Sequence, residues 1–594
     1  MKVESVTRFD KGIDGSIDSA FHQHFDIYSD PHRLIPYRST EAELDSVSAA
    51  NLGDSHLRNF QLGKNGVMYA LGETGGLAQV FQKTLPASGT WGVATTAVAS
   101  ATFTVIYEAF IEWGTTPAFY MFTKTATLSK WTIGSTFTDT VLGLGATITS
   151  VAQGVVGADD NLYMFYNNKV VRITNAGTAS DNVLTNLPSD MRIVSACRWG
   201  SYIAIGMAYG TSNISPPSGV SKVFIWDMVT TTTVNDVIDW GEGALRVLGN
   251  IEGRLVGVSD KYLTNPISLS NGAMVVRMWA GATPQVKAEI VANQLVTADA
   301  TAFPSTVTRF PRDVVIKDNR MHWVASVPFG ASTSTESTYH LGIWAFGRKD
   351  ANSDFALSLD YIEEAVDTAN YFINSFGNAG NYWFISHGAA GLVHKTDDTA
   401  NYTHTSVYEK VFGNGRDTFK IKGITAMFDA LPTAGQVALS YKKDEETAFS
   451  SIFVFGTDDA MRHSATSIEN LTAGGDVVTL TIASPCVVTL TSHRLVAGNI
   501  IRFSTTGALP TGITAGLDYY VISAGLATNT FRFSATLGGS AVNTSGSQSG
   551  THTLDRARAL PQYKKIRIRV ESTGNAVISG ISFLPEFVPD DNYA

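Results

Sequence analysis

The sequence predicts an all-β protein: a β-propeller of about seven blades, followed by a β-sandwich that carries a small inserted β domain. Three observations lead to this fold class. Only 16% of the 594 residues are charged while 53 are glycine, a balance that favours strands and turns over helices. One hairpin pattern recurs along the first two thirds of the chain. The apolar runs within it lack the polar alternation of a half-buried strand.

The hairpin pattern is clearest in residues 157–174, GADDNLYMFYNNKVVRIT. A polar turn precedes an apolar run from Leu162 to Tyr166. Asn167-Asn168 then interrupts the run, and an alternating stretch from Lys169 to Ile173 follows, which together predict a β-hairpin. Because a lone hairpin is only marginally stable in water, further copies are expected to cover its apolar face.

Six other segments repeat the order of turn, short apolar run, turn and alternating strand. They are residues 62–72, 114–134, 197–210, 249–260, 316–330 and 377–396. Their spacing brackets the roughly 40–50 residues of a propeller blade. Runs such as AFYMF, LYMFY and YWFI are apolar throughout, so we expect them to be the inner strands, covered on both faces by neighbouring blades. The predicted propeller spans residues 51–414.

The remaining segments predict three further parts. Residues 1–50 have many turn formers and little periodicity, which indicates an extended N-terminal arm that lies along its own propeller, where it supplies a closing strand, or along a neighbouring subunit. Residues 415–466 and 556–594 predict a discontinuous β-sandwich. Residues 467–555 predict a β module inserted into a sandwich loop. The basic stretch 556–570 is expected to be an edge strand with solvated charges.

The composition excludes several classes of function. The formal net charge is −10 and no dense block of Lys and Arg is present, which argues against a nucleic-acid-binding face. Cys197 and Cys486 are far apart, so neither a disulfide framework nor a CxxC site is expected. No apolar run reaches about 18 residues and no secretory signal begins the sequence, so we expect synthesis in a cytoplasm without membrane insertion.

Several polar clusters are candidate sites. His22, His24 and His32 would suit a metal on an assembly axis, but without nearby cysteines or carboxylates ordinary arm histidines are favoured. Asp159-Asp160-Asn161 and Asp318-Asn319-Arg320 resemble incomplete calcium loops, and their position favours hairpin turns.

Paired carboxylates and aromatic side chains are candidate catalytic and sugar-binding residues. Asp360, Glu363 and Glu364 could suggest glycoside hydrolysis, but SLDYIEEAVDTA is expected to be a polar link between two blades. The tryptophans of FIWD, MWAG, IWAF and NYWFI could stack on sugars, yet packing between blades is favoured. No nucleophile elbow or phosphate-binding loop is present. We therefore predict no catalytic, cofactor-binding or metal-ligating residue, no cofactor and no enzymatic activity.

The inserted block contains three segments in a characteristic order: LPTGITAGLDYYVI (509–522), NTFRFSAT (529–536) and GTHT (550–553). In order and composition they resemble a small β module common in fibres and tail components of tailed bacteriophages. The arrangement of propeller followed by sandwich resembles the tail nozzle or hub of short-tailed phages.

These resemblances imply a structural component of the virion tail. The expected partners are further copies of the chain in a homo-hexameric ring, the portal or adaptor, and tail fibre or spike proteins. Genomic DNA would pass through the ring without specific binding. The alternative is a receptor-binding or fibre-anchoring protein that recognises a cell-surface glycan through the inserted module. A third hypothesis is a polysaccharide-degrading tail enzyme. The sequence contains no pattern of carboxylates that would form the catalytic pocket of such an enzyme.

Overall fold

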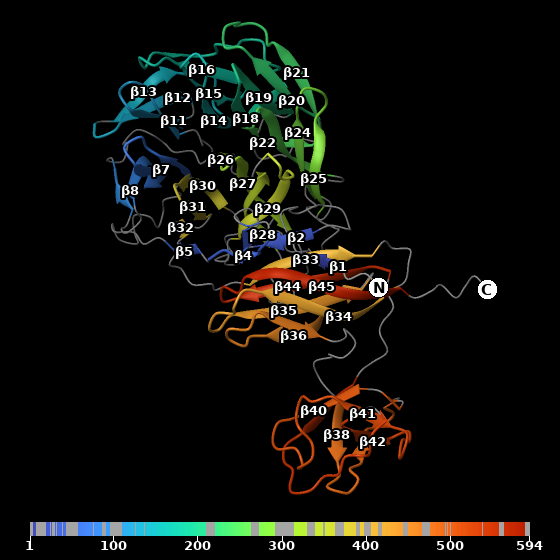
Figure 1. Ribbon diagram of the computed structural model, residues 1–594. Helices are drawn as coiled ribbons and strands as arrows, with labels where there is room; N and C mark the ends of the chain where they lie inside the picture. Colours follow the sequence, from blue (N-terminus) through green and yellow to red (C-terminus); the bar gives the residue numbers. More distant parts are fainter. Residues whose placement is uncertain are drawn as a thin grey trace, which may run out of the picture. The chain divides into compact units, whose positions relative to one another are not determined.

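The computed structural model describes residues 4–6, 20–23, 25–26, 30, 32–38, 40–42, 58–74, 77–85, 91–94, 110–124, 126–135, 137–209, 220–262, 272–291, 314–328, 339–348, 351–362, 373–387, 393–396, 405–413, 419–443, 449–465, 476–493, 495, 497–498, 500–536, 538–556 and 564–587. They form strands and turns in two compact units (Figure 1). Unit 1 comprises Met1–Phe9, His32–Leu34 and Val407–Ala594; unit 2 comprises Asp10–Pro31 and Ile35–Ser406. The all-β fold class is confirmed. Within these ranges no helix has the length and hydropathy needed to cross a bilayer.

Seven four-stranded antiparallel sheets occupy the described part of unit 2. The first four are β6 (Arg58–Leu62), β7 (Val67–Thr74), β8 (Leu77–Thr84) and β9 (Gly92–Val93); β10 (Phe110–Trp113), β11 (Ala118–Lys124), β12 (Thr127–Thr132) and β13 (Phe137–Gly143); β14 (Val151–Val156), β15 (Leu162–Tyr166), β16 (Lys169–Ile173) and β17 (Ala179–Ser180); and β18 (Met191–Trp199), β19 (Tyr202–Tyr209), β20 (Val220–Trp226) and β21 (Asp236–Glu242). The other three are β22 (Ala244–Ile251), β23 (Arg254–Tyr262), β24 (Gly272–Trp279) and β25 (Gln285–Val291); β26 (Val315–Lys317), β27 (Arg320–Pro328), β28 (Tyr339–Gly347) and β29 (Ala356–Ile362); and β30 (Ile373–Ala379), β31 (Tyr382–His387), β32 (Val393–Thr396) and β5 (Thr40–Ala42).

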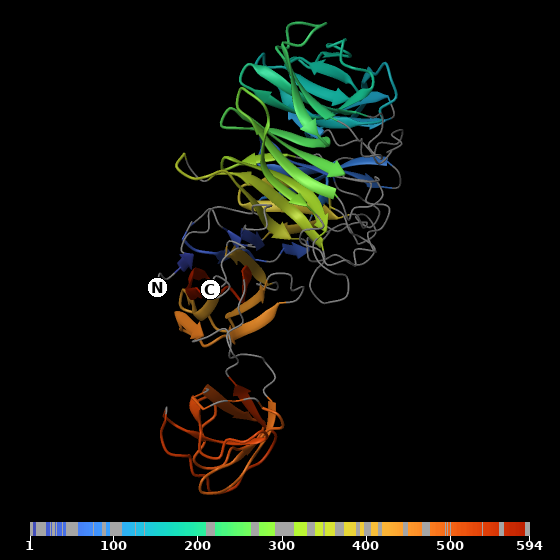
Figure 2. The same ribbon diagram turned by 90° about the vertical axis from the view of Figure 1, so that its right-hand side faces the viewer.

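The sheets close into a ring. Contacts run from β6 through β10, β14, β18 and β22 to β26 and β27, then to β30 and back to β6 (Figures 1 and 2). A separate hydrophobic cluster joins each sheet to the next, and the cluster containing Phe60, Met68 and Phe384 joins the seventh sheet to the first. This closed succession of packed sheets is a β-propeller.

The hairpin that introduced the repeat forms as predicted. Strands β15 and β16 pair in register from Leu162 opposite Ile173 to Tyr166 opposite Lys169. The intervening Asn167 has a φ of 50°, in the left-handed region that tight hairpin turns require. Its amide side chain also accepts hydrogen bonds from the backbone of Thr149 and Ser150, which ties the turn to the entry of the same sheet.

The apolar runs occupy a different place from the one predicted. AFYMF, LYMFY and YWFI form β11, β15 and β31, the second strands of their sheets, whereas β10, β14 and β30 enclose the axis. A second strand has sheets packed on both of its faces. In β15, Tyr163 and Phe165 enter the core shared with the fourth sheet, and Met164 and Tyr166 enter the core shared with the second. Both faces are apolar because both are buried.

One hydrogen bond crosses the region enclosed by the first strands. The backbone N–H of Val314, which precedes β26 of the sixth sheet, donates to Gln153 Oε1 of β14 in the third sheet at 3.4 Å. Gln153 lies in a bulge of β14, where the register with β15 shifts between Ala152 and Val155. Such a bulge re-aims side chains out of the regular pleat.

The predicted N-terminal arm is divided between the two units: β1 (Glu4–Val6) belongs to a sheet of unit 1, whereas other strands of the arm contact the propeller. Strand β5 pairs with β32 as the fourth strand of the seventh sheet, with Glu41 opposite Lys395. Strands β2 (Ala20–Gln23) and β3 (Phe25–Asp26) contact β29, and β3 pairs with β4 (Ile35–Pro36). Phe25 is fully buried. This packing explains why β29, the last strand of the sixth sheet, is buried from Ala356 to Asp360.

Unit 1 contains the predicted sandwich. One sheet has the order β1 (Glu4–Val6), β45 (Ile578–Phe587), β34 (Phe419–Phe428), β37 (Arg462–Ala465); the other contains β33 (Ser406–Phe412), β44 (Ile566–Thr573), β35 (Gln436–Lys443) and β36 (Ser450–Phe455) in that order. Two expectations are wrong. Strand β33 belongs to this sheet and not to the propeller, which moves the boundary from 414 to about Ser406. Strand β44 lies between two strands and not at an edge, and its Arg567 and Arg569 bind the buried Glu409 at 3.0 and 2.7 Å.

The inserted module is a closed barrel (Figure 2). Its buried apolar side chains form one hydrophobic core. Its strands follow one another around the barrel as β38 (Asp476–Leu480), β39 (Val488–Thr489), β42 (Thr530–Ser534), β41 (Tyr519–Ile522), β40 (Ile500–Thr505) and β43 (His552–Arg556). The rings of Phe503, Tyr519 and Phe533 pack on one another at the centre, with centroids 4.8 to 5.8 Å apart. The first and last strands pair, Asp476 lying opposite Leu554. Both ends of the insert are therefore adjacent, as a loop insertion requires.

Candidate functional site

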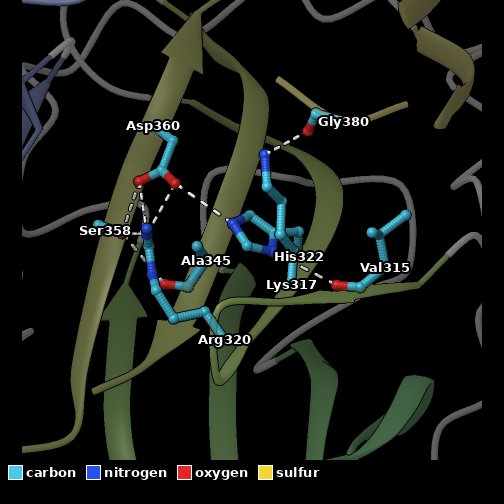
Figure 3. A network of polar contacts seen from close by, with 8 residues as sticks. All are labelled: Val315, Lys317, Arg320, His322, Ala345, Ser358, Asp360 and Gly380. Carbon is cyan, nitrogen blue, oxygen red and sulfur yellow. Dashed lines mark hydrogen bonds and ion pairs between the residues drawn. The ribbon is translucent and has the colours of Figure 1, made fainter. Parts of the chain in front are cut away.

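A buried network of polar and charged side chains lies in the sixth sheet of the propeller (Figure 3). Arg320 Nη2 donates to Asp360 Oδ1 and Oδ2 at 2.8 and 2.7 Å and to Ser358 Oγ at 2.7 Å. The Ser358 hydroxyl donates to Asp360 Oδ1 at 2.7 Å. His322 Nε2 lies 3.5 Å from Asp360 Oδ2, and His322 Nδ1 lies 3.4 Å from the carbonyl oxygen of Val315. All four side chains are buried.

Strand register brings these residues together. Arg320 and His322 alternate on β27, and Ser358 and Asp360 alternate on β29, so each pair shares a face. Strand β28 runs between them and places Gly347 opposite Arg320. A Cβ on Gly347 would lie 2.6 Å from Arg320 Cγ, so glycine is needed where the arginine crosses the strand.

The geometry at Asp360 has a second cause. The register of β28 with β29 shifts between Ile343 and Trp344, which makes Asp360 the extra residue of a β-bulge. A bulge turns its extra side chain away from the regular direction. The hairpin turn before Arg320 is also specific, because Asp318 and Asn319 have φ of 52° and 59°.

The environment fixes the protonation state of the network. Burial alone would raise the pKa of Asp360, but the charge of Arg320 and the hydrogen bonds from His322 and Ser358 outweigh it and hold this pKa well below 3.8. Burial lowers the pKa of His322 below its usual 6.5, and the nearby Asp360 only partly offsets that effect. At neutral pH the network is an ionised Arg320–Asp360 pair beside a neutral histidine.

The network lies at the junction of the sixth sheet, the seventh sheet and the arm. The His322 ring packs on Trp383 of β31 with centroids 4.7 Å apart, and Lys317 donates to the carbonyl oxygen of Gly380 at 2.8 Å. On the arm side, Tyr37 packs on Tyr361 at 4.6 Å. Burial, and then the charge of Asp360, raise the pKa of the Tyr37 hydroxyl.

This arrangement suits stabilisation of the packing between sheets better than catalysis. Serine, histidine and aspartate are all present, but the Ser358 hydroxyl donates to Asp360 and binds Arg320, so the imidazole does not activate it as a nucleophile. The carboxylate has its oxygens engaged by Arg320 and Ser358. What the cluster supplies is a buried ion pair at the junction of the sixth sheet, the seventh sheet and the arm.

Of the candidate residues named from the sequence, Arg320 and Asp360 meet in the buried network. Asp159 accepts hydrogen bonds from Asn161 and Tyr163 at 2.6 Å, which confirms the turn interpretation. His32 is exposed in a turn, His22 lies in β2, and His24, Glu363 and Glu364 lie outside the described residues. The described residues contain no group of three or more His, Cys, Asp or Glu suited to a metal ion.

Two further expectations can be compared with the structure. Asp360 is not in a polar link between blades, because it lies within β29 and is covered by the arm and the seventh sheet. The tryptophans of the four aromatic motifs are buried, as predicted: Trp226, Trp279, Trp344 and Trp383. The two cysteines are free, Cys197 half-buried and Cys486 buried.

The sequence reasoning missed His322 and Ser358 and treated Arg320 and Asp360 separately. The available signal was the alternation R-x-H on one strand and S-x-D on another, about 40 residues apart, with a glycine on the strand between them. Only the pairing register converts that spacing into contacts.

No family model matches the chain, and no curated protein matches it. Solved structures similar to it are β-propellers: virginiamycin B lyase from Staphylococcus aureus (8% identity, 60% of this chain and 99% of that chain, TM-score 0.35), the Dos1 propeller (9%, 61% and 95%, TM-score 0.35) and the Neurospora crassa Pan2 WD40 domain (10%, 64% and 100%, TM-score 0.35). We derive neither an activity nor a partner from these similarities.

Proposed function

We propose that this chain is a structural component of a bacteriophage tail, a nozzle- or hub-like homo-hexameric ring that serves as a DNA conduit and as an attachment platform for portal or adaptor and fibre or spike proteins. The observation that carries the proposal is the inserted module. Each of its three tail-protein-like segments overlaps a barrel strand: 509–522 overlaps β41, 529–536 overlaps β42 and 550–553 overlaps β43. The segments that carry the resemblance thus contribute to three of the six barrel strands.

The construction of unit 2 supports a mechanical role. Every sheet shares a hydrophobic core with both neighbours, so no sheet shifts without opening two cores. The polar cluster around Asp360 is buried at the junction of the sixth sheet, the seventh sheet and the arm, and its groups bind one another. Closed protein interiors of this kind are stiff and transmit strain.

The proposed DNA path lies on the axis of the ring of copies, outside each propeller. The hydrogen bond from Val314 to Gln153 spans the propeller's own enclosed region, which leaves that region unsuited to a duplex. The formal net charge of −10 fits a wall that repels passing phosphates, since screening over about 10 Å leaves a field at close range.

The test is to image particles that carry a gold-binding tag after Gly538, an exposed glycine of the barrel with open space around its Cα. We expect label in a ring at the tail, and an inner wall that is net negative in a map of that ring. Label elsewhere on the particle, particles without the chain, or a basic inner wall would contradict the proposal.

The alternative is that the barrel binds a cell-surface glycan or anchors a fibre. The observation that favours it is the barrel's independence, together with the exposed Val477 and Leu517 on its surface. A glycan array probed with residues 474–558 separates the two functions. Saturable binding to one glycan class supports the alternative, and no binding leaves the structural role.

A further inference from the structure

One strand at the edge of a sheet differs from the other edge strands. A free edge presents unpaired backbone N–H and C=O groups, and proteins protect such edges by short length, charged side chains or a covering segment. Apart from the strands that enclose the propeller axis, most edge strands of the described chain have this protection. Strands β1, β2, β3, β4, β5, β9, β17 and β37 have at most four residues, β13, β21 and β25 carry charged residues, and the arm contacts β29.

Strand β36 of unit 1 lacks this protection. Its six residues, SSIFVF, include no charge, proline or glycine, and it lies at the end of its sheet beyond β35. A register shift places a bulge at Ile452, whose side chain is buried, but Phe453 to Phe455 pair with β35 without interruption. Within the described residues, no further backbone group bonds to the outward edge of β36. Short uncharged segments of this composition readily pair with a further strand.

Apolar and acidic side chains border this edge. Val454 of β36 is 63% exposed, and Met461, which directly precedes β37, is 66% exposed. The two strands are close here, because the ring of His463 in β37 stacks on Phe455 with centroids 4.2 Å apart. In the connecting residues 456–462, the exposed Asp458 and Asp459 accompany one arginine. The C-terminal end of β36 therefore combines exposed apolar surface with a net negative charge.

The charges indicate which kind of strand fits the edge. At the other end of β36, Lys442 and Arg569 lie over the ring of Phe449, and both already have partners within the chain. A second copy of the chain would bring a further formal net charge of −10, and repulsion between like charges disfavours its approach. A strand of another protein with basic residues beside its apolar run is attracted by the same charges.

We propose that the free edge of β36 is a docking site for an extended segment of another protein, which adds to the sheet as a further strand and has basic residues next to an apolar run. Backbone groups of β36 form hydrogen bonds with the added strand, Val454 and Met461 contact its apolar side chains, and the acidic residues Asp458 and Asp459 attract its basic flank. The site does not depend on the proposed tail function.

The test is a selection of random twelve-residue peptides that bind the full chain, from which peptides that also bind Val454→Lys are removed. Lysine at this position protects the edge as it does in natural edge strands, and it repels a basic partner. The remaining peptides are expected to contain an uncharged apolar run beside Lys or Arg. A selected peptide with a fluorescent label should bind Val454→Lys at least about tenfold more weakly, measured by anisotropy, which corresponds to about 1.4 kcal/mol.

Val477→Lys is the matched control, because Val477 is 66% exposed on the closed barrel, which has no free edge. Its affinity for the selected peptide should equal that of the wild type. Proline at alternate positions of the peptide should abolish binding, because proline has no N–H to donate to β36.

Circular dichroism shows whether each variant folds. If Val454→Lys does not fold, Asp459→Asn replaces it, since asparagine tolerates the φ of 61° at this position and removes one negative charge. Its affinity for the peptide should fall at least about twofold and depend less on salt. Three results would overturn the proposal: no selected peptide or only peptides with acidic flanks, an unchanged affinity in the variant that folds, or self-association of the wild type in sedimentation that the variant loses.

Discussion

Asp360 is buried against one arginine, and its removal leaves that charge without compensation. Asp360→Asn is expected to lower the free energy of unfolding of unit 2 by about 3–5 kcal/mol, the usual cost of breaking a buried ion pair from one side. Urea denaturation followed by tryptophan fluorescence measures the change.

Asp239→Asn provides the matched control, because Asp239 lies 3.6 Å from Lys222 and is largely exposed. A surface pair of that kind contributes about 0–1 kcal/mol. Similar losses in the two variants would show that the Asp360 network does not behave as a buried pair.

His322 makes unit 2 sensitive to acid. Its pKa in the folded protein lies below 6.5, so as the pH falls below 6.5 the unfolded chain takes up a proton that the folded chain excludes, and stability decreases. The urea midpoint of the wild type should fall between pH 7 and pH 5. In His322→Gln the decrease in urea midpoint between pH 7 and pH 5 should be smaller than in the wild type, whatever the variant's midpoint at pH 7. An equal decrease in the two proteins would show that the histidine does not contribute to the acid sensitivity.

At the residue scale, the sequence could indicate which side chains are buried, but it could not indicate which side chains contact one another. The buried tryptophans and the Asx turns follow from local pattern. The Arg320–Asp360 contact depends on a strand register, a glycine on the intervening strand and a bulge, and none of these is visible in residue spacing alone.

At the scale of elements, the hairpins were predictable and their order within each sheet was not. An apolar run of five residues indicates a strand covered on both faces, and both the first and second strands of a propeller sheet are candidates. The axis-lining β14 reads VAQGVV, with Gln153 and Gly154 at a bulge, so its sequence is less apolar than its position suggests.

The arm is an element whose contribution can be measured. Phe25 is fully buried on β3, which packs against β29, so Phe25→Ala should lower the stability of unit 2 by about 3–5 kcal/mol through lost burial and a cavity. Val229→Ala is the control, since Val229 is 81% exposed and should change stability by less than about 0.5 kcal/mol. Tryptophan fluorescence in urea measures both, and a small effect of Phe25→Ala would mean that the arm is not part of the cooperative unit.

At the scale of the whole molecule, the insert is predicted to fold by itself. The strands between Asp476 and Arg556 form a closed barrel with its own core and paired first and last strands. A fragment of residues 474–558 should therefore give one cooperative thermal transition by circular dichroism. Its replacement by a short Gly/Ser linker should leave the tryptophan-monitored midpoint of unit 2 unchanged. A broad transition in the isolated module would show that it depends on the sandwich.

The seventh sheet joins β5 to β32, strands from near residues 40 and 395. During translation at about 5–20 residues per second, the ribosome delivers the second strand about 20 to 70 s after the first. Throughout that interval β5 lacks the strand with which it pairs, and the ring of sheets is open. Biogenesis therefore includes a vulnerable period that ends only when synthesis has passed the last sheet, and chaperone demand should peak there.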